Sequence, residues 1–246
     1  MNAFRLALIA CLLTGCATKM VGLRHDPSFK YETAISGKMA VGGIATLSDE
    51  LKLRDTDRAA NVLRAQIIEA RETYNVAPMG VVMNALGKKQ HQKLVSAFNE
   101  TGTLSPVWLN TLKKKLPNQR YVVLSRVEGN DINKDRSESY DQDSKGNAIY
   151  SRSTIRSTVT RRVTTSFNIF DLQLQKSVWS GMLSKSARAS NSFRKVDDKS
   201  IVGIIRAVKA QDIPDEQRFP YPEPPQLVSV LGDIYRGFAK NLPKED

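Results

Sequence analysis

The chain has 246 residues, a formal net charge of +12 and hydrophobic residues at 41% of its positions. This length is enough for one large domain or two small ones, each with its own core. Two cysteines, two histidines and no Gly-rich phosphate loop exclude most zinc, nucleophilic and nucleotide chemistry. We therefore expect a protein that binds no metal or cofactor and is not an enzyme.

The N-terminus has the pattern of an export signal. Arg5 precedes an apolar run from Leu6 to Leu13, and small residues follow it. A basic start, an apolar stretch of about 7 to 15 residues and small residues at the cut are typical of a secretory signal peptide. A membrane-spanning helix needs about 20 apolar residues. We therefore predict a signal peptide at residues 1–15.

The end of this signal, Leu13-Thr14-Gly15-Cys16, resembles the lipobox of bacterial lipoproteins. The resemblance implies cleavage between Gly15 and Cys16, and a Cys16 that carries diacylglycerol and a further acyl chain such as palmitate. The residue after the cysteine is not Asp. In this respect the sequence resembles lipoproteins that are anchored in the outer membrane and face the periplasm. The alternative is an ordinary signal peptide with Cys16 beside it by chance.

The positive charge has a different meaning in the periplasm than in the cytoplasm. We expect no nucleic acid there, and the available polyanions are lipid head groups, lipopolysaccharide phosphates and acidic peptides. The alternative is a solvated basic surface without a dedicated partner. Loss of Cys11 with the signal and lipidation of Cys16 leave no disulfide pair.

The residues after Cys16 predict a lipidated tether at 16–33 and then a single periplasmic α/β domain at 34–246. A first strand covers Ile35 to Leu47, with a bulge at Gly42-Gly43. Helical spacing and capping residues predict helices from Asp55 or Asp57 to Tyr74, at 79–86, at 91–99 and from Pro106 to about 116. His91 is expected on a helix surface.

The second half of the chain predicts a long antiparallel hairpin. A strand at 121–127 is followed by a polar loop at 129–150, and then by a strand from Arg152 to Leu172 whose apolar and polar residues alternate. Arg161 interrupts its apolar side, and 177–183 returns as the partner strand. Helices are expected at 201–208 and 227–242. The predicted fold is α/β: a mixed β-sheet with helices packed mainly on one face, and a C-terminal helix.

The order of these elements, with Tyr121-Val-Val-Leu124 and Asp171 followed by Val178-Trp179-Ser-Gly181, resembles one periplasmic α/β domain. That domain is shared by curli-secretion lipoproteins of the CsgG type, lipoprotein activators of penicillin-binding proteins and the amino-terminal domain of TolB. The resemblance implies that the chain binds partners and does not catalyse a reaction.

The leading hypothesis is a membrane-anchored periplasmic lipoprotein that binds another envelope protein in envelope assembly or secretion. Its candidate partner surface is the basic side of the long strand, with Arg152, Arg156 and Arg162. One alternative is an oligomeric secretion-channel component of the CsgG type, which would be a homo-oligomer. Arg161 argues against a hairpin that faces lipid. A third is an envelope hydrolase or small-ligand binder.

Overall fold

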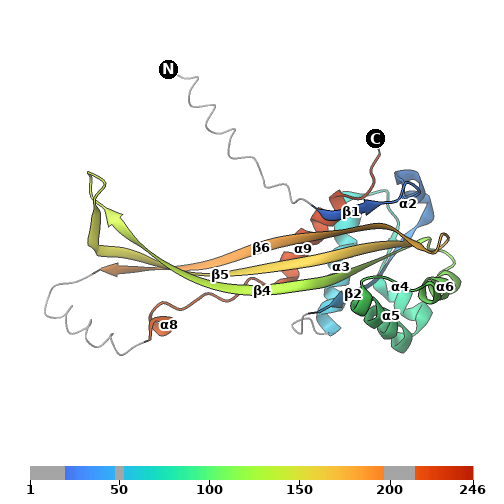
Figure 1. Cartoon of the computed structure of the whole chain (residues 1–246), viewed down its shortest axis with the longest axis horizontal. Helices are drawn as coiled ribbons and strands as arrows, with labels where there is room; N and C mark the ends of the chain where they lie inside the picture. Colours follow the sequence, from blue (N-terminus) through green and yellow to red (C-terminus); the bar gives the residue numbers. More distant parts are fainter. Residues whose placement is uncertain (1–19, 48–52, 197–213, 246) are drawn as a thin grey trace, which may run out of the picture. The chain divides into compact units, whose positions relative to one another are not determined.

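The computed structural model describes residues 20–47, 53–196 and 214–245 (Figure 1). The predicted cleavage and lipidation positions Gly15 and Cys16, and the helix predicted at 201–208, lie outside the described residues. The described elements are β1 (Val21–His25), α2 (Tyr31–Gly37), β2 (Met39–Thr46), α3 (Leu53–Ala70), β3 (Val76–Ala77), α4 (Met79–Leu86), α5 (Lys88–Thr101), α6 (Pro106–Lys115), β4 (Tyr121–Gln142), β5 (Ala148–Asp171), β6 (Lys176–Val196), α8 (Asp215–Arg218) and α9 (Leu227–Lys240).

The strands form one mixed sheet in the order β1-β6-β5-β4-β2-β3. β2 is parallel to β3 and β4, and β1 is antiparallel to β6. Short turns join β4 to β5 and β5 to β6, which makes these neighbours antiparallel (Figure 1). The α/β class, the mixed sheet, the long hairpin and the C-terminal helix are confirmed.

The described chain divides into two compact units. Unit 1 comprises the described residues of 20–128, 164–185 and 232–245, and unit 2 comprises those of 129–163 and 186–231. β4, β5, β6 and α9 contribute residues to both units. Each unit is therefore described by itself.

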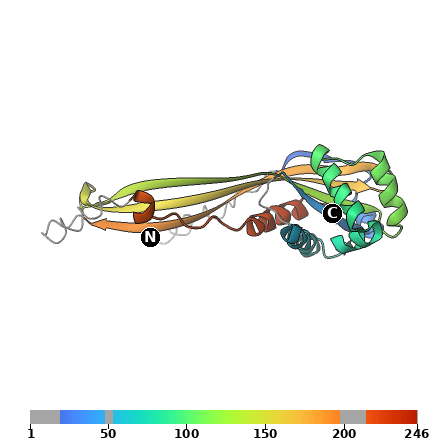
Figure 2. The same cartoon turned by 90° about the horizontal axis from the view of Figure 1, so that it is seen from below.

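Helices cover both faces of the sheet in unit 1, whereas the sequence predicted mainly one. Phe170 of β5 meets Phe98 of α5 edge to face, with ring centroids 6.3 Å apart. Phe167 of the same strand stacks on Phe238 of α9 at 4.3 Å. Residues three apart in a strand point to opposite faces. Figure 2 shows the red helix α9 on one side of these strands and the green helices α5 and α6 on the other.

The local signals for the helices of unit 1 are mostly confirmed. α4 spans Met79–Leu86 and ends at Gly87, and α6 begins at Pro106 after the cap residue Ser105. The bulge predicted in the first strand is present, because the pairing of β2 with β4 shifts register between Val41 and Gly43. The predicted start of that strand was wrong, because residues 35–37 form the end of helix α2.

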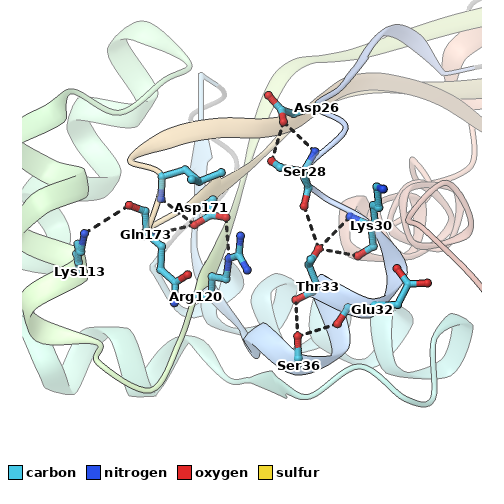
Figure 3. Close-up of polar contacts among 11 residues, drawn as sticks. Asp26, Ser28, Lys30, Glu32, Thr33, Ser36, Lys113, Arg120, Asp171 and Gln173 are labelled. Carbon is cyan, nitrogen blue, oxygen red and sulfur yellow. Dashed lines mark hydrogen bonds and ion pairs between the residues drawn. The ribbon is translucent and has the colours of Figure 1, made fainter.

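Buried ionic and polar contacts fix the start of β4 to the end of β5. The Arg120 Nε donates to the Asp171 carboxylate at 2.8 Å, and the Asp171 side chain is fully buried. The second carboxylate oxygen accepts from the backbone N–H groups of Gln173 and Leu174. Figure 3 shows Arg120 pointing at Asp171 beside the turn that carries Gln173. This network satisfies a charge that would be costly to bury alone.

The polar loop predicted at 129–150 is instead strand on both sides of a short turn. β4 continues to Gln142 and β5 begins at Ala148. Asp143 organises the turn, because its Oδ1 accepts from the backbone N–H of Lys145 at 2.8 Å and of Asn147 at 2.9 Å. The prediction failed because the hydrogen bonds between strands join backbone groups only. A segment with polar side chains can therefore form a strand without alternating apolar residues.

The predicted tether also contains regular structure. β1 occupies 21–25 and α2 begins at Tyr31. Asp26 holds the connection between them, since its carboxylate accepts from the backbone N–H of Ser28 at 3.0 Å (Figure 3). The same carboxylate pairs with the ammonium of Lys176 at 2.6 Å. The pKa of Asp26 is held well below its usual range, first by Lys176 and then by Ser28.

Candidate functional site

In unit 2, one side of β5 is buried and the other is exposed. Ser153, Ile155, Ser157, Val159, Arg161 and Val163 are buried. The three arginines proposed from the sequence, Arg152, Arg156 and Arg162, are all exposed. The structure therefore places them on the same side of one strand, as the alternation predicted.

Strand β6 extends this exposed side. Its residues alternate in the same way, with Arg188 and Arg194 exposed. The hydroxyl of Ser190 lies 3.1 Å from that of Thr158 on the exposed side of β5. We call this surface the basic face, formed by Arg152, Arg156, Arg162, Arg188 and Arg194.

β5 and β6, which carry the arginines of the basic face, contain almost no acidic residues, whereas the adjacent β4 carries Asp131, Asp135 and Asp141. Neither residues 148–170 nor residues 176–196 contain an Asp or Glu. Arg194 pairs with Asp141 of β4 at 3.1 Å. Within the described part of the chain, the side chains of Arg152, Arg156 and Arg162 form no ion pair. These three guanidinium groups remain available for an external anion.

A proline-rich segment at 214–226, called the strap here, packs on the opposite side of the strands of unit 2. The Arg136 guanidinium of β4 stacks over the ring of Tyr221, 4.9 Å from its centroid, and donates to the Phe219 carbonyl at 3.0 Å. The buried Ser157 hydroxyl donates to that same carbonyl at 2.9 Å. From β6, Asn191 donates to the carbonyl of Pro220 at 3.2 Å.

Contacts with the strap and with β4 explain why polar side chains can be buried in unit 2. Phe219 shields Ser157, and Phe193 of β6 meets the Phe219 ring at 5.8 Å. Arg161, which interrupts the apolar side, donates to the side-chain oxygen of Asn130 at 2.9 Å. Hydrogen bonds to these buried polar groups offset the cost of removing them from water.

Sequence reasoning missed two arginines of the basic face. Arg188 and Arg194 lie in the extension of β6 beyond residue 183, where the sequence predicted no strand. The absence of Gly and Pro at 184–192 was the one weak signal for this extension, since its side chains resemble those of a loop. The strap had no comparable signal, because its partners in β4, β5 and β6 lie from about 26 to about 83 residues away in the chain.

Unit 1 contains a cavity of about 390 Å³ at the end of β2. His91 of α5 lines it and is 6% exposed, which corrects its predicted place on a helix surface. Its Nε2 donates to the carbonyl of Gly42 at 2.8 Å, so this ring stabilises the bulge of β2. The rest of the wall is mainly apolar, with Met79, Met83 and Val95 among its residues.

Two carboxylates near the turn between β4 and β5 have structural roles. Asp141 pairs with Arg194, and Asp143 accepts hydrogen bonds within the turn, chiefly from Asn147, which lower its pKa. Among the described residues, no group of three or more His, Cys, Asp or Glu side chains could hold a metal ion.

The chain matches no family model and no curated protein sequence. Solved structures with some likeness include a PelC dodecamer from Paraburkholderia phytofirmans, with 12% identity, 91% of this chain and 96% of that chain covered, and a TM-score of 0.36. Lipoprotein GNA1162 from Neisseria meningitidis has 18% identity, with 71% and 95% covered and a TM-score of 0.30.

The C-terminal domain of LpoB from Salmonella enterica has 11% identity, with 61% of this chain and 82% of that chain covered and a TM-score of 0.30. Scores at this level are too low for an inference about function. The function is therefore derived from the residues of this chain.

Proposed function

We propose that this chain is a non-catalytic lipoprotein of the bacterial cell envelope, anchored through Cys16 to the outer membrane and facing the periplasm. The export signal and the lipobox-like sequence Leu13-Thr14-Gly15-Cys16 support the anchor. Among residues 20–47, 53–196 and 214–245, no helix is both long and apolar enough to cross a membrane.

The basic face is the proposed binding surface for another envelope protein. The observation that carries this proposal is the exposure of Arg152, Arg156 and Arg162 on one side of β5, without an ion-pair partner in the described chain. Arginine forks recognise carboxylates through paired hydrogen bonds. The partner should therefore present an acidic, extended surface, and binding should weaken as salt increases.

A charge-reversal experiment tests the binding surface. The variant Arg152→Glu, Arg156→Glu and Arg162→Glu should lose the protein that is captured by crosslinking in living cells. A matched control is Lys89→Glu, Lys93→Glu and Lys114→Glu, which changes three exposed lysines of α5 and α6. Equal capture by both variants, with native circular dichroism, would refute the assignment of this face.

The anchor has a separate test. Cys16→Ser should leave the protein unprocessed or release it from the membrane fraction, and mass spectrometry of the wild-type protein should find acyl chains on Cys16. Separation of inner and outer membranes by density then tests whether the protein is anchored in the outer membrane. A wild-type protein without acyl chains would contradict the anchor but leave the basic face untouched.

The second candidate function is an oligomeric export component. It is favoured by the open edges of unit 2: the described pairing of β2 with β4 ends at Val127, and that of β1 with β6 ends at Met182. Unpaired edges can hydrogen bond to another chain. Detergent extracts analysed by light scattering should then contain oligomers, and a strictly monomeric extract would contradict this function.

A further inference from the structure

One corner of unit 1 exposes apolar side chains next to the start of the described chain. Val21 and Leu23 of β1 are 59% and 48% exposed, and Met182 of β6 is 36% exposed. Val21 and Met182 are register partners and face one side of the sheet, whereas Leu23 lines a cavity together with Trp179 on the other side. The edge strand β1 therefore exposes apolar side chains on both of its sides.

The chain is fixed to the sheet from Met20 onward. A Cβ at Gly181 would lie 2.5 Å from the sulfur of Met20, so this side chain occupies the space that the glycine leaves free. Three residues separate Cys16 from Met20, and the four Cα–Cα steps between them span at most about 14 Å in an extended chain. A lipid on Cys16 would therefore hold this corner close to the bilayer surface.

Basic side chains surround the same corner. Leu23 lines a cavity of about 830 Å³ together with Lys30, Lys240 and Lys244, and Glu32 is the single acidic residue in its wall. Arg71 is also in the wall, but its guanidinium donates to the backbone carbonyls of Lys240 and Leu242. The three lysines are exposed, so the corner combines apolar and cationic groups.

We propose that this corner, formed by Leu23, Lys30, Lys240 and Lys244 on one face of the sheet, rests on the anionic phospholipid surface that holds the acyl chains of Cys16. The proposal rests on the lipidation proposed above. The Leu23 side chain enters the boundary between head groups and acyl chains, and the lysines lie at the level of the lipid phosphates. The lipidated residue attaches the protein to the membrane, and this contact holds unit 1 in a fixed orientation against the membrane surface.

A fluorescent label can report the contact. The mature lipidated protein has no free thiol, since Cys11 leaves with the signal and Cys16 is alkylated, so Leu23→Cys introduces a single labelling site. The control is Val107→Cys, because Val107 is 74% exposed on α6 and lies close to Lys113–Lys115. Both proteins are reconstituted into vesicles of phosphatidylcholine with phosphatidylglycerol and a head-group quencher.

We expect quenching at position 23 to exceed that at position 107 by about threefold or more. Lys30→Glu with Lys244→Glu should reduce the quenching at position 23 in these vesicles and leave it unchanged in pure phosphatidylcholine. Equal quenching at both positions in a protein with confirmed acyl chains would overturn the membrane contact and leave the anchor intact. Absence of acyl chains would overturn both.

Discussion

The two parts of β5 bury different chemistry. In unit 1, the buried residues of this strand include Phe167, Ile169 and Phe170, which pack against aromatic residues of α5 and α9. In unit 2 they include Ser153, Ser157 and Arg161. Unit 1 is thus stabilised mainly by apolar packing, whereas the buried polar groups of unit 2 depend on hydrogen bonds to β4 and to the strap, and on cation–aromatic contacts with the strap.

Because of this difference, the residues that stabilise the fold can be tested separately from those proposed to bind a partner. An apolar core tolerates little change in volume, because its side chains are close-packed. A polar buried face depends on a few specific partners, and it leaves the opposite face free for charged residues. Substitutions in the two units should therefore differ in how much they lower the free energy of unfolding and in which region of the protein they loosen.

The largest effect is expected at the aromatic core of unit 1. Phe238 stacks on Phe167 at 4.3 Å and meets Trp179 at 5.0 Å. Phe238→Ala should lower the free energy of unfolding by about 3–5 kcal/mol, because it removes buried surface and leaves a cavity. Urea unfolding followed by tryptophan fluorescence measures it. Val107→Ala, at an exposed position, is the control and should change little.

A smaller and more local effect is expected under the strap. Arg136→Ala removes the stacking on Tyr221 and the hydrogen bond to Phe219, and it should cost about 1–3 kcal/mol. Hydrogen exchange should accelerate at 214–226. Arg136→Lys keeps the charge but loses the planar fork, so it should resemble Arg136→Ala. Unchanged exchange in both variants would show that the strap is held by other contacts.

A pH effect is expected at Asp26 in unit 1. Its pKa is lowered in the folded state, first by Lys176, so the carboxylate contributes stability above the unfolded pKa of about 3.9 and loses it as pH falls toward the folded pKa. Asp26→Asn should therefore destabilise the protein at pH 7 and somewhat less at pH 3, which lies below the unfolded pKa but still above the folded one. Urea unfolding at both values measures this, and an equal loss at both would contradict the assignment.

The smallest effect is expected on the basic face. Arg156 is exposed, so Arg156→Ala should change the free energy of unfolding by less than about 0.5 kcal/mol. Its neighbour Ser157 is fully buried and donates to Phe219, so Ser157→Ala should cost about 1 kcal/mol. Thermal unfolding of the two variants compares the exposed and the buried side of β5 directly. Equal losses of stability would contradict the division into a buried and an exposed side.

The sequence predicted the elements whose signals are local. Gly87 ends α4, Pro106 opens α6, and the two-residue period of β5 placed Arg152, Arg156 and Arg162 on one side. Polar stretches were harder to predict. The extensions of β4 and β6 were missed because their side chains resemble those of loops, and only pairing with β5 makes them strands.

Burial of polar residues also depended on distant segments. His91 is polar and close to other polar residues in the sequence, but the carbonyl of Gly42, 49 positions away, gives it a buried hydrogen bond. Arg136 is similar, because its ring and carbonyl partners belong to the strap. Nothing in the neighbouring sequence indicates such partners.

The sequence by itself determined the α/β class and the alternation of β5, and it predicts an export signal with a lipobox-like end, because these depend on composition and short-range spacing. Only the tertiary structure decided which alternating face is covered, that Arg188 and Arg194 join the basic face, and that Met20 lies over Gly181. Those features arise where segments far apart in the chain meet, and each contact depends on the position of both.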